Sequence, residues 1–133
     1  MRQTALFLFL LIMVSTVSAK AEDIVGKWEG KSPQGEKISY EFKADKSVIW
    51  NIDSDTFPGP ITAHYSVDYS TKPVKLDMFD FSYAPMNAVR VLAIVEFISP
   101  TKIKIDAAHV PQGSDTKRPS HFTRETIEFD KIE

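Results

Sequence analysis

Short segments in which apolar and polar residues alternate constrain the fold of this chain more than any other feature. The stretch 37–43 reads KISYEFK, so its Ile, Tyr and Phe fall on one face and its polar residues on the other. A period of two is typical of a half-buried β-strand. Similar stretches recur along the chain and are rich in Val, Ile, Phe, Tyr and Trp, which favour strands. The pattern therefore predicts an all-β protein.

Eight segments carry these strand signals, and Gly, Pro, Asp, Asn, Ser and Lys separate them. They are 24–30, 37–43, 47–52, 61–68, 74–79, 89–97, 102–107 and 123–132. The connections are mostly short, which suits antiparallel neighbours. A meander of eight strands buries its apolar face by closing into a barrel or by folding into a sandwich, and closure leaves no exposed edge. We therefore predict an eight-stranded antiparallel up-and-down β-barrel.

The first 21 residues follow a different pattern. Arg2 precedes an apolar block at 5–14, and small polar residues follow, which is the layout of a secretory signal peptide. Cleavage after Ala21, or alternatively after Ala19, satisfies the small-residue rule. The apolar block is shorter than the roughly 20 residues that a membrane-spanning helix needs. We expect a leader over 1–21, one domain over 22–133, export to the periplasm or the cell exterior, and no stable membrane anchor after cleavage.

The composition restricts the partners and the chemistry of the chain. Its formal net charge is −2, it has no run of basic residues, and it has no cysteine. A mildly acidic chain attracts phosphate backbones poorly, so we expect no nucleic-acid partner. Without disulfides, an exported domain of this size depends on its hydrophobic core.

Residues that could carry catalysis or bind a metal are scattered along the sequence. His64, His109 and His121 form no HxH or HxxxH pair, and Asp77 stands between Leu76 and Met78 on a predicted outward face. The chain has no Gly-x-Ser-x-Gly elbow and no glycine-rich phosphate loop. We therefore expect no catalytic residue, no metal and no cofactor, and we assign Asp77 a structural role.

Gly26-Lys27-Trp28 in the first predicted strand resembles the Gly-x-Trp signature of lipocalins and of the wider calycin group. The chain is more closely similar to small exported bacterial lipocalin-like domains. The shared features are IVGKWEG at 24–30, YSVDYSTKPVKLDM at 65–78, and Arg118-Pro119 with Phe122. The resemblance implies a lipocalin-like barrel over nearly all of 22–133. Lipocalins usually also carry a helix beside the barrel, for which this sequence gives no signal.

In barrels of this kind the signature Trp closes one end, and a cation from the end of the chain packs across its indole face. The resemblance therefore implies that Trp28 is a plug, with Gly26 letting the strand bend where the barrel narrows. The sequence leaves the cation open among Arg118, Arg124 and Lys131.

Four large side chains are expected to point into the barrel and to line a ligand site. They are Trp50, Tyr65, Met78 and Phe97. An eight-stranded barrel is either filled by its side chains or holds one small ligand. Since one aromatic residue buries about 150–250 Å², both alternatives stay open.

The loop 79–88 carries an apolar cluster of Phe81, Tyr83 and Met86. Such clusters often mark contact sites, and this one is a lid over the barrel, a partner patch, or a loop folded onto the core. Our reading is an exported monomer that binds a small apolar or amphipathic molecule. The alternative is a non-enzymatic protein-interaction module, an envelope accessory protein or inhibitor, with a packed barrel.

Overall fold

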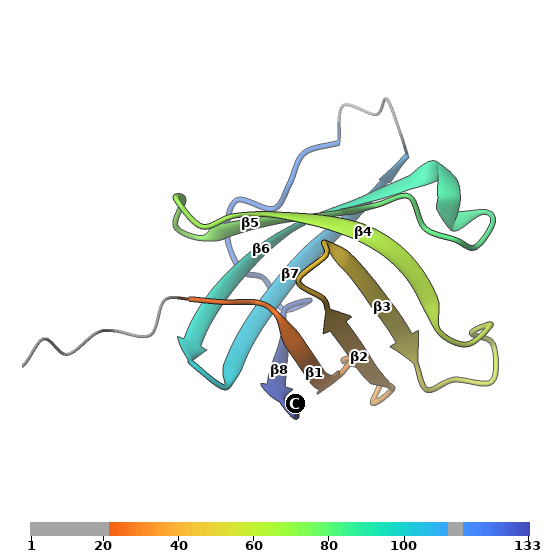
Figure 1. The fold of residues 1–133 in the computed structure, drawn as a ribbon, viewed down its shortest axis with the longest axis horizontal. Coiled ribbons are helices and arrows are strands. Elements are labelled where there is room, and N and C mark those ends of the chain that lie inside the picture. The colour runs from red at the N-terminus through yellow and green to blue at the C-terminus, as the bar shows by residue number, and fades with distance from the viewer. Residues whose placement is uncertain (1–21, 112–115) are drawn as a thin grey trace, which may run out of the picture.

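Eight antiparallel strands, each paired with the next and the last with the first, close into one barrel (Figure 1). The computed structural model describes residues 22–111 and 116–133; the expected leader at 1–21 and its cleavage points lie outside them. The strands are β1 (Gly26–Lys31), β2 (Lys37–Phe42), β3 (Ser47–Ile52), β4 (Ile61–Asp68), β5 (Val74–Phe79), β6 (Val89–Ser99), β7 (Lys102–Pro111) and β8 (Ile127–Lys131). The predicted all-β, up-and-down barrel is confirmed.

The last third of the chain differs from the sequence-based bounds. β7 continues beyond Ala107 to Pro111, because β6 offers it a partner as far as Val89. His109 therefore lies in β7, opposite Val91, and not in the following loop. A short 3-10 helix, η1 (Met86–Ala88), interrupts the β5–β6 loop. Among the described residues no helix is long and apolar enough to cross a membrane.

The inward side chains of the strands form one continuous core. Cross-strand pairing places Trp28 opposite Tyr40, and Tyr40 opposite Trp50, so three large aromatic residues line one row across β1–β3. The largest fully buried side chains are Trp28, Phe42, Phe129, Ile24, Leu76, Met78, Ile103, Val48, Val74 and Val95. This core takes the place of the disulfides that the chain lacks.

The two ends of the barrel have different coverings. The closed end carries the segment 22–25 and the β2–β3, β4–β5 and β6–β7 turns. The loop end carries the β1–β2 turn, the longer β3–β4 loop (53–60) and the β5–β6 loop (80–88). In Figure 1 the β4–β5 turn of the closed end lies at the left, and the β3–β4 and β5–β6 loops lie at the right.

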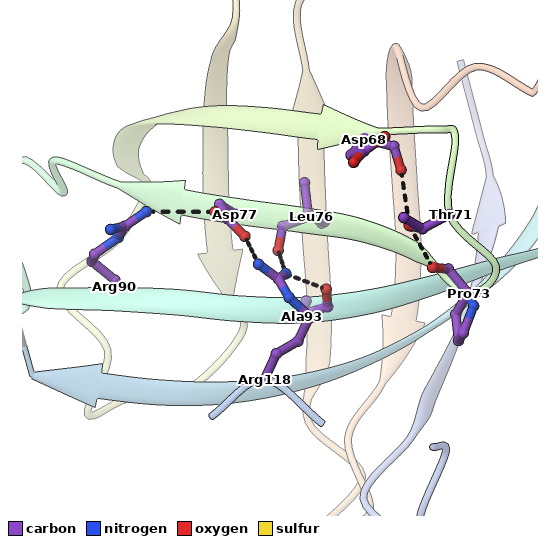
Figure 2. A network of polar contacts seen from close by, with 8 residues as sticks. All are labelled: Asp68, Thr71, Pro73, Leu76, Asp77, Arg90, Ala93 and Arg118. Carbon is purple, nitrogen blue, oxygen red and sulfur yellow. Dashed lines mark hydrogen bonds and ion pairs between the residues drawn. The ribbon is translucent and has the colours of Figure 1, made fainter. Parts of the chain in front are cut away.

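A segment without regular structure, residues 116–126, lies against the outer face of the barrel. We call it the C-terminal strap. Arg118 of the strap donates hydrogen bonds to the carbonyl oxygens of Leu76 in β5 (3.1 Å) and Ala93 in β6 (2.8 Å), and pairs with the Asp77 carboxylate (Figure 2). Asp77 also accepts a contact from Arg90 at 3.4 Å. The strap therefore fastens to the backbone of two neighbouring strands.

A second fastening of the strap is the buried carboxylate of Asp106 in β7. It accepts hydrogen bonds from the Thr123 amide (2.9 Å), the Thr123 hydroxyl (2.7 Å) and the Thr126 hydroxyl (2.9 Å). Burial opposes ionisation of Asp106, but these bonds outweigh it and hold its pKa below the ordinary value. Ile94, opposite Asp106 in β6, is 2 % exposed, so β6 is buried on both faces at this point.

Candidate ligand site at the loop end of the barrel

Trp28 plugs the closed end. Its side chain is fully buried, and its indole Nε1 donates a 2.8 Å hydrogen bond to the carbonyl oxygen of Ile24. The Ile24 amide in turn donates to the Tyr69 hydroxyl at 3.1 Å, which draws the segment 22–25 across the end of the barrel. The Lys131 Nζ lies 5.6 Å from the centre of the indole ring. The structure thus places both the plug and its cation at the closed end.

The other two cations that the sequence offered lie elsewhere. Arg118 belongs to the outer face, where it binds Asp77 and the two strand carbonyls. Arg124 is 95 % exposed at its side chain and approaches only Glu125, at 4.0 Å, among the ion pairs described. Lys131 is distinguished by its register, because it stands directly opposite Trp28 across the β1–β8 pair.

The glycines on either side of Trp28 allow close approach of the end of the chain. Gly26 has φ +139°, and a Cβ there would lie 2.8 Å from the carbonyl oxygen of Glu133. A Cβ at Gly30 would collide with the carbonyl oxygen of Glu128 and touch the Phe129 ring. Contact with the last strand and the C-terminus, as well as bending, therefore explains these two positions.

Three of the four residues predicted to line a ligand site belong to the closed end or to the solid core. The Tyr65 hydroxyl donates to the carbonyl oxygen of Lys43 at 2.6 Å, and burial raises the pKa of Tyr65 to about 12. Met78 is 1 % exposed within the core. Phe97 packs 6.3 Å from the Tyr69 ring and lines surface hollows of about 350 and 470 Å³ at the closed end. The ring contacts described at Trp50 involve other residues.

Trp50 lies near the loop end and is surrounded by aromatic rings. The ring centre of Phe57 is 5.1 Å away, that of Phe81 is 6.0 Å away, and that of His109 is 6.2 Å away. Trp50 is 8 % exposed, and its indole Nε1 is buried without a hydrogen-bond partner among the described residues. A buried donor in this condition costs about 1–3 kcal/mol, and an acceptor that reached it would remove this cost.

The loops above Trp50 are attached to the barrel in different ways. In the β5–β6 loop, Ser82 exchanges two hydrogen bonds with Thr62 of β4, at 2.9 and 3.1 Å. In the β3–β4 loop, the Phe57 amide donates to the Ser54 carbonyl at 3.2 Å, and the Ser54 and Thr56 hydroxyls contact each other at 3.0 Å. The Asp53 amide joins the start of this loop to the Lys37 carbonyl of β2 at 2.8 Å, whereas the bonds described at Phe57 are local. The Phe57 ring therefore covers Trp50 from a part of the loop that is bonded only to its own neighbours among the described residues.

The apolar cluster predicted in the β5–β6 loop divides between core and surface. Phe81 is 3 % exposed and Met86 packs against the core, whereas Tyr83 is 41 % exposed. Much of the cluster therefore folds back onto the barrel, which was one of the three alternatives. Phe57 and His109 were missed as neighbours of Trp50. Phe57 lies between turn residues with no periodicity, and His109 lies beyond the predicted end of the seventh strand at residue 107.

The two loops above Trp50 are acidic. Residues 53–60 and 80–88 contain three aspartates, Asp53, Asp55 and Asp80, and no lysine or arginine. All three aspartates are exposed. The Lys31 and Lys37 side chains at the neighbouring β1–β2 turn line a hollow on the outside of β1, β2 and β8, and Lys37 pairs with Glu29 at 3.0 Å.

The residues considered for catalysis or metal binding are not gathered in one place. His64 is exposed on β4, with its Nδ1 3.7 Å from Asp80, while Asp77 is held by Arg118 and Arg90 on the outer face. Within 22–111 and 116–133, no group of three or more His, Asp or Glu residues is placed to hold a metal ion.

Comparisons with known proteins do not assign the chain to a family. No family model, curated protein or solved structure matches it. The fold itself defines a class: an eight-stranded antiparallel barrel in up-and-down order, consistent with a lipocalin-like fold, with a plugged end and an aromatic loop end.

Proposed function

We propose that this protein is an exported, non-enzymatic lipocalin-like monomer that binds one small apolar or amphipathic molecule at the loop end of its barrel. The observation that carries the proposal is the Trp50 indole N–H, which is buried with no partner in the described part of the chain. Aromatic rings surround it, and apolar rings with one oriented polar group are typical of small-molecule sites.

The depth of the site is limited by the core beneath it. Met78, Leu76 and Phe42 are at most 1 % exposed, so the lower barrel is filled by its own side chains. A ligand would enter between the β3–β4 and β5–β6 loops and take the place of the Phe57 ring against Trp50. This requires a movement of the β3–β4 loop, whose bonds at Phe57 are local, and leaves the barrel unchanged.

The two tryptophans of the chain can report on ligand binding separately. The Trp28 indole N–H is bonded to the Ile24 carbonyl, whereas that of Trp50 has no partner among the described residues. Protein purified from its own host is analysed by native mass spectrometry, and any bound molecule is extracted and identified. The extract is then added to protein that has been stripped of ligand, and both indole resonances are followed in nitrogen–proton correlation spectra. We expect the Trp50 resonance to move and the Trp28 resonance, held by Ile24, to stay.

Two outcomes would contradict the proposal. In the first, the protein purified from its host carries no bound molecule, and a panel of apolar compounds leaves the Trp50 resonance unchanged. The other is a movement of the Trp28 resonance without that of Trp50, which would place the ligand at the closed end.

A second candidate function, a protein-interaction module, is favoured by the exposed Tyr83 above a packed barrel. It predicts that an envelope protein cross-linked to this chain in its host is lost in Tyr83→Ser. Ile98→Ser is the control, since Ile98 is similarly exposed, at 48 %, but lies near the β6–β7 turn at the closed end. Equal cross-linking in both variants would remove this candidate.

A further inference from the structure

We infer that the site at Trp50 selects uncharged molecules that carry a hydrogen-bond acceptor, such as esters, ketones or amides, and discriminates against carboxylates of the same length. The inference rests on the proposed function and names its class of ligand. It follows from the kind of polar group at the site and from the charges around it.

The polar group at the site is the indole nitrogen of Trp50. The indole N–H is a donor only, so the ligand atom that meets Trp50 must be an acceptor. Trp50 is 8 % exposed, and the ring centres of Phe57 and Phe81 lie 5.1 and 6.0 Å from its own. A pure hydrocarbon would fill the aromatic surroundings and leave the donor without a partner. A molecule with an acceptor beside an apolar body satisfies both.

The two loops above Trp50 carry negative charge. A carboxylate is also an acceptor, but an ion that leaves water needs a partner of opposite charge. The two loops above Trp50 supply Asp53, Asp55 and Asp80 and no lysine or arginine. Like charges near the site raise the free energy of a bound carboxylate further. A neutral carbonyl accepts the same hydrogen bond without these two costs.

Two basic side chains on elements near the two loops are held in ion pairs on the outer face. Lys37 at the β1–β2 turn pairs with Glu29 at 3.0 Å on the outer face. Arg90 at the start of β6 contacts Asp77 at 3.4 Å, also on the outer face. His109 is a basic side chain whose ring centre lies 6.2 Å from that of Trp50. Burial lowers the pKa of His109, which favours the neutral ring and so offers a carboxylate little compensation.

The experiment compares methyl nonanoate with nonanoic acid, which share an apolar chain and differ in charge at neutral pH. Each probe is titrated into the stripped full-length mature protein while the indole resonances of Trp50 and Trp28 are recorded. We expect the ester to bind at least about tenfold more tightly than the acid, because only the acid must bury a charge. A tenfold difference in affinity corresponds to about 1.4 kcal/mol. In Trp50→Phe, we expect ester affinity to fall about 2- to 10-fold, the range for one lost neutral hydrogen bond.

A charge variant separates repulsion from desolvation. Asp53→Asn/Asp55→Asn removes two negative charges from the β3–β4 loop, and Glu128→Gln/Asp130→Asn removes two from the exposed face of β8. Acid binding should tighten in the first double variant and stay unchanged in the second. Equal effects would show that net charge alone matters and would overturn the assignment to this loop.

The outcomes distinguish the inference from the proposed function. If the acid binds as tightly as the ester and both move the Trp50 resonance, the inference is wrong while the ligand site stands. If neither probe moves that resonance and the host-purified protein is also empty, the proposed function fails and the inference fails with it.

Discussion

At the scale of single residues, Trp28 is the largest fully buried side chain in the described part of the chain. It is fully buried, bonded to the Ile24 carbonyl at 2.8 Å, and covered by the Lys131 ammonium. Trp28→Ala should lower the free energy of unfolding by about 3–5 kcal/mol, the range for large buried side chains. Urea denaturation followed by circular dichroism measures this loss.

The cation on Trp28 can be tested separately. Lys131→Gln should lower the free energy of unfolding by about 0.5–1 kcal/mol, as expected for a cation over an aromatic face at a partly exposed site. Arg124→Gln is the matched control and should stay within about 0.5 kcal/mol of the parent, since surface substitutions usually do. Equal losses in the two variants would remove the assigned role of Lys131.

At the scale of elements, the C-terminal strap is held to the barrel by a few polar fastenings. Arg118→Met removes its hydrogen bonds to Leu76 and Ala93 and its ion pair with Asp77. We expect the free energy of unfolding to fall by about 1.5–3 kcal/mol, the range for hydrogen bonds of charged groups. Amide exchange at Thr123 should accelerate, whereas exchange in β2 should change less. Lys117→Met, at the exposed neighbouring position, serves as the control.

The Asp106 fastening of the strap gives a pH-dependent prediction. Hydrogen bonds from Thr123 and Thr126 outweigh burial and hold the pKa of Asp106 below its ordinary value of about 3.9. The ionised form therefore stabilises the folded state above that value, and this stabilisation is lost as the pH falls through the lower, folded pKa. Asp106→Asn should be destabilised near neutral pH, and its difference from the parent should shrink on acidification below about pH 4. A difference that stays constant down to acid unfolding would contradict this role.

The same elements show what the sequence can predict. Alternation located strands that have one face in the core, as in β4, where Ile61, Ala63 and Tyr65 are buried between exposed neighbours. β6 is buried on both faces around Ile94, and its content of Val and Ile indicated a strand instead. Alternation did not place the end of β7, since strand length there depends on pairing with the distant β6. Trp50 was found from its face, but its neighbours Phe57 and His109 depend on how separate loops and strand ends meet. The choice of Lys131 likewise follows from the register of β1 with β8.

At the scale of the whole molecule, the barrel joins its first and last strands. The Lys27 amide donates to the carbonyl oxygen of Glu133 at 2.8 Å, and the Ile132 amide donates to the carbonyl oxygen of Lys27 at 2.8 Å. The β1–β8 pair therefore closes the barrel, and the core lies inside a ring of strands with each element supported by two neighbours. Loss of one strand pair exposes the core that all the others share.

This closure predicts that both ends of the barrel unfold together. Trp28 reports on the closed end and Trp50 on the loop end, and their folded-state indole resonances can be followed separately in increasing urea. Both should lose intensity with the same midpoint, as expected for two-state unfolding of a small domain. In Phe57→Ala the Trp50 indole proton should exchange faster with solvent while the common midpoint stays shared, because only the covering ring is lost. An earlier midpoint for Trp50 in the parent chain would show instead that the loop end unfolds on its own, and the ligand site would then be formed by folding on binding.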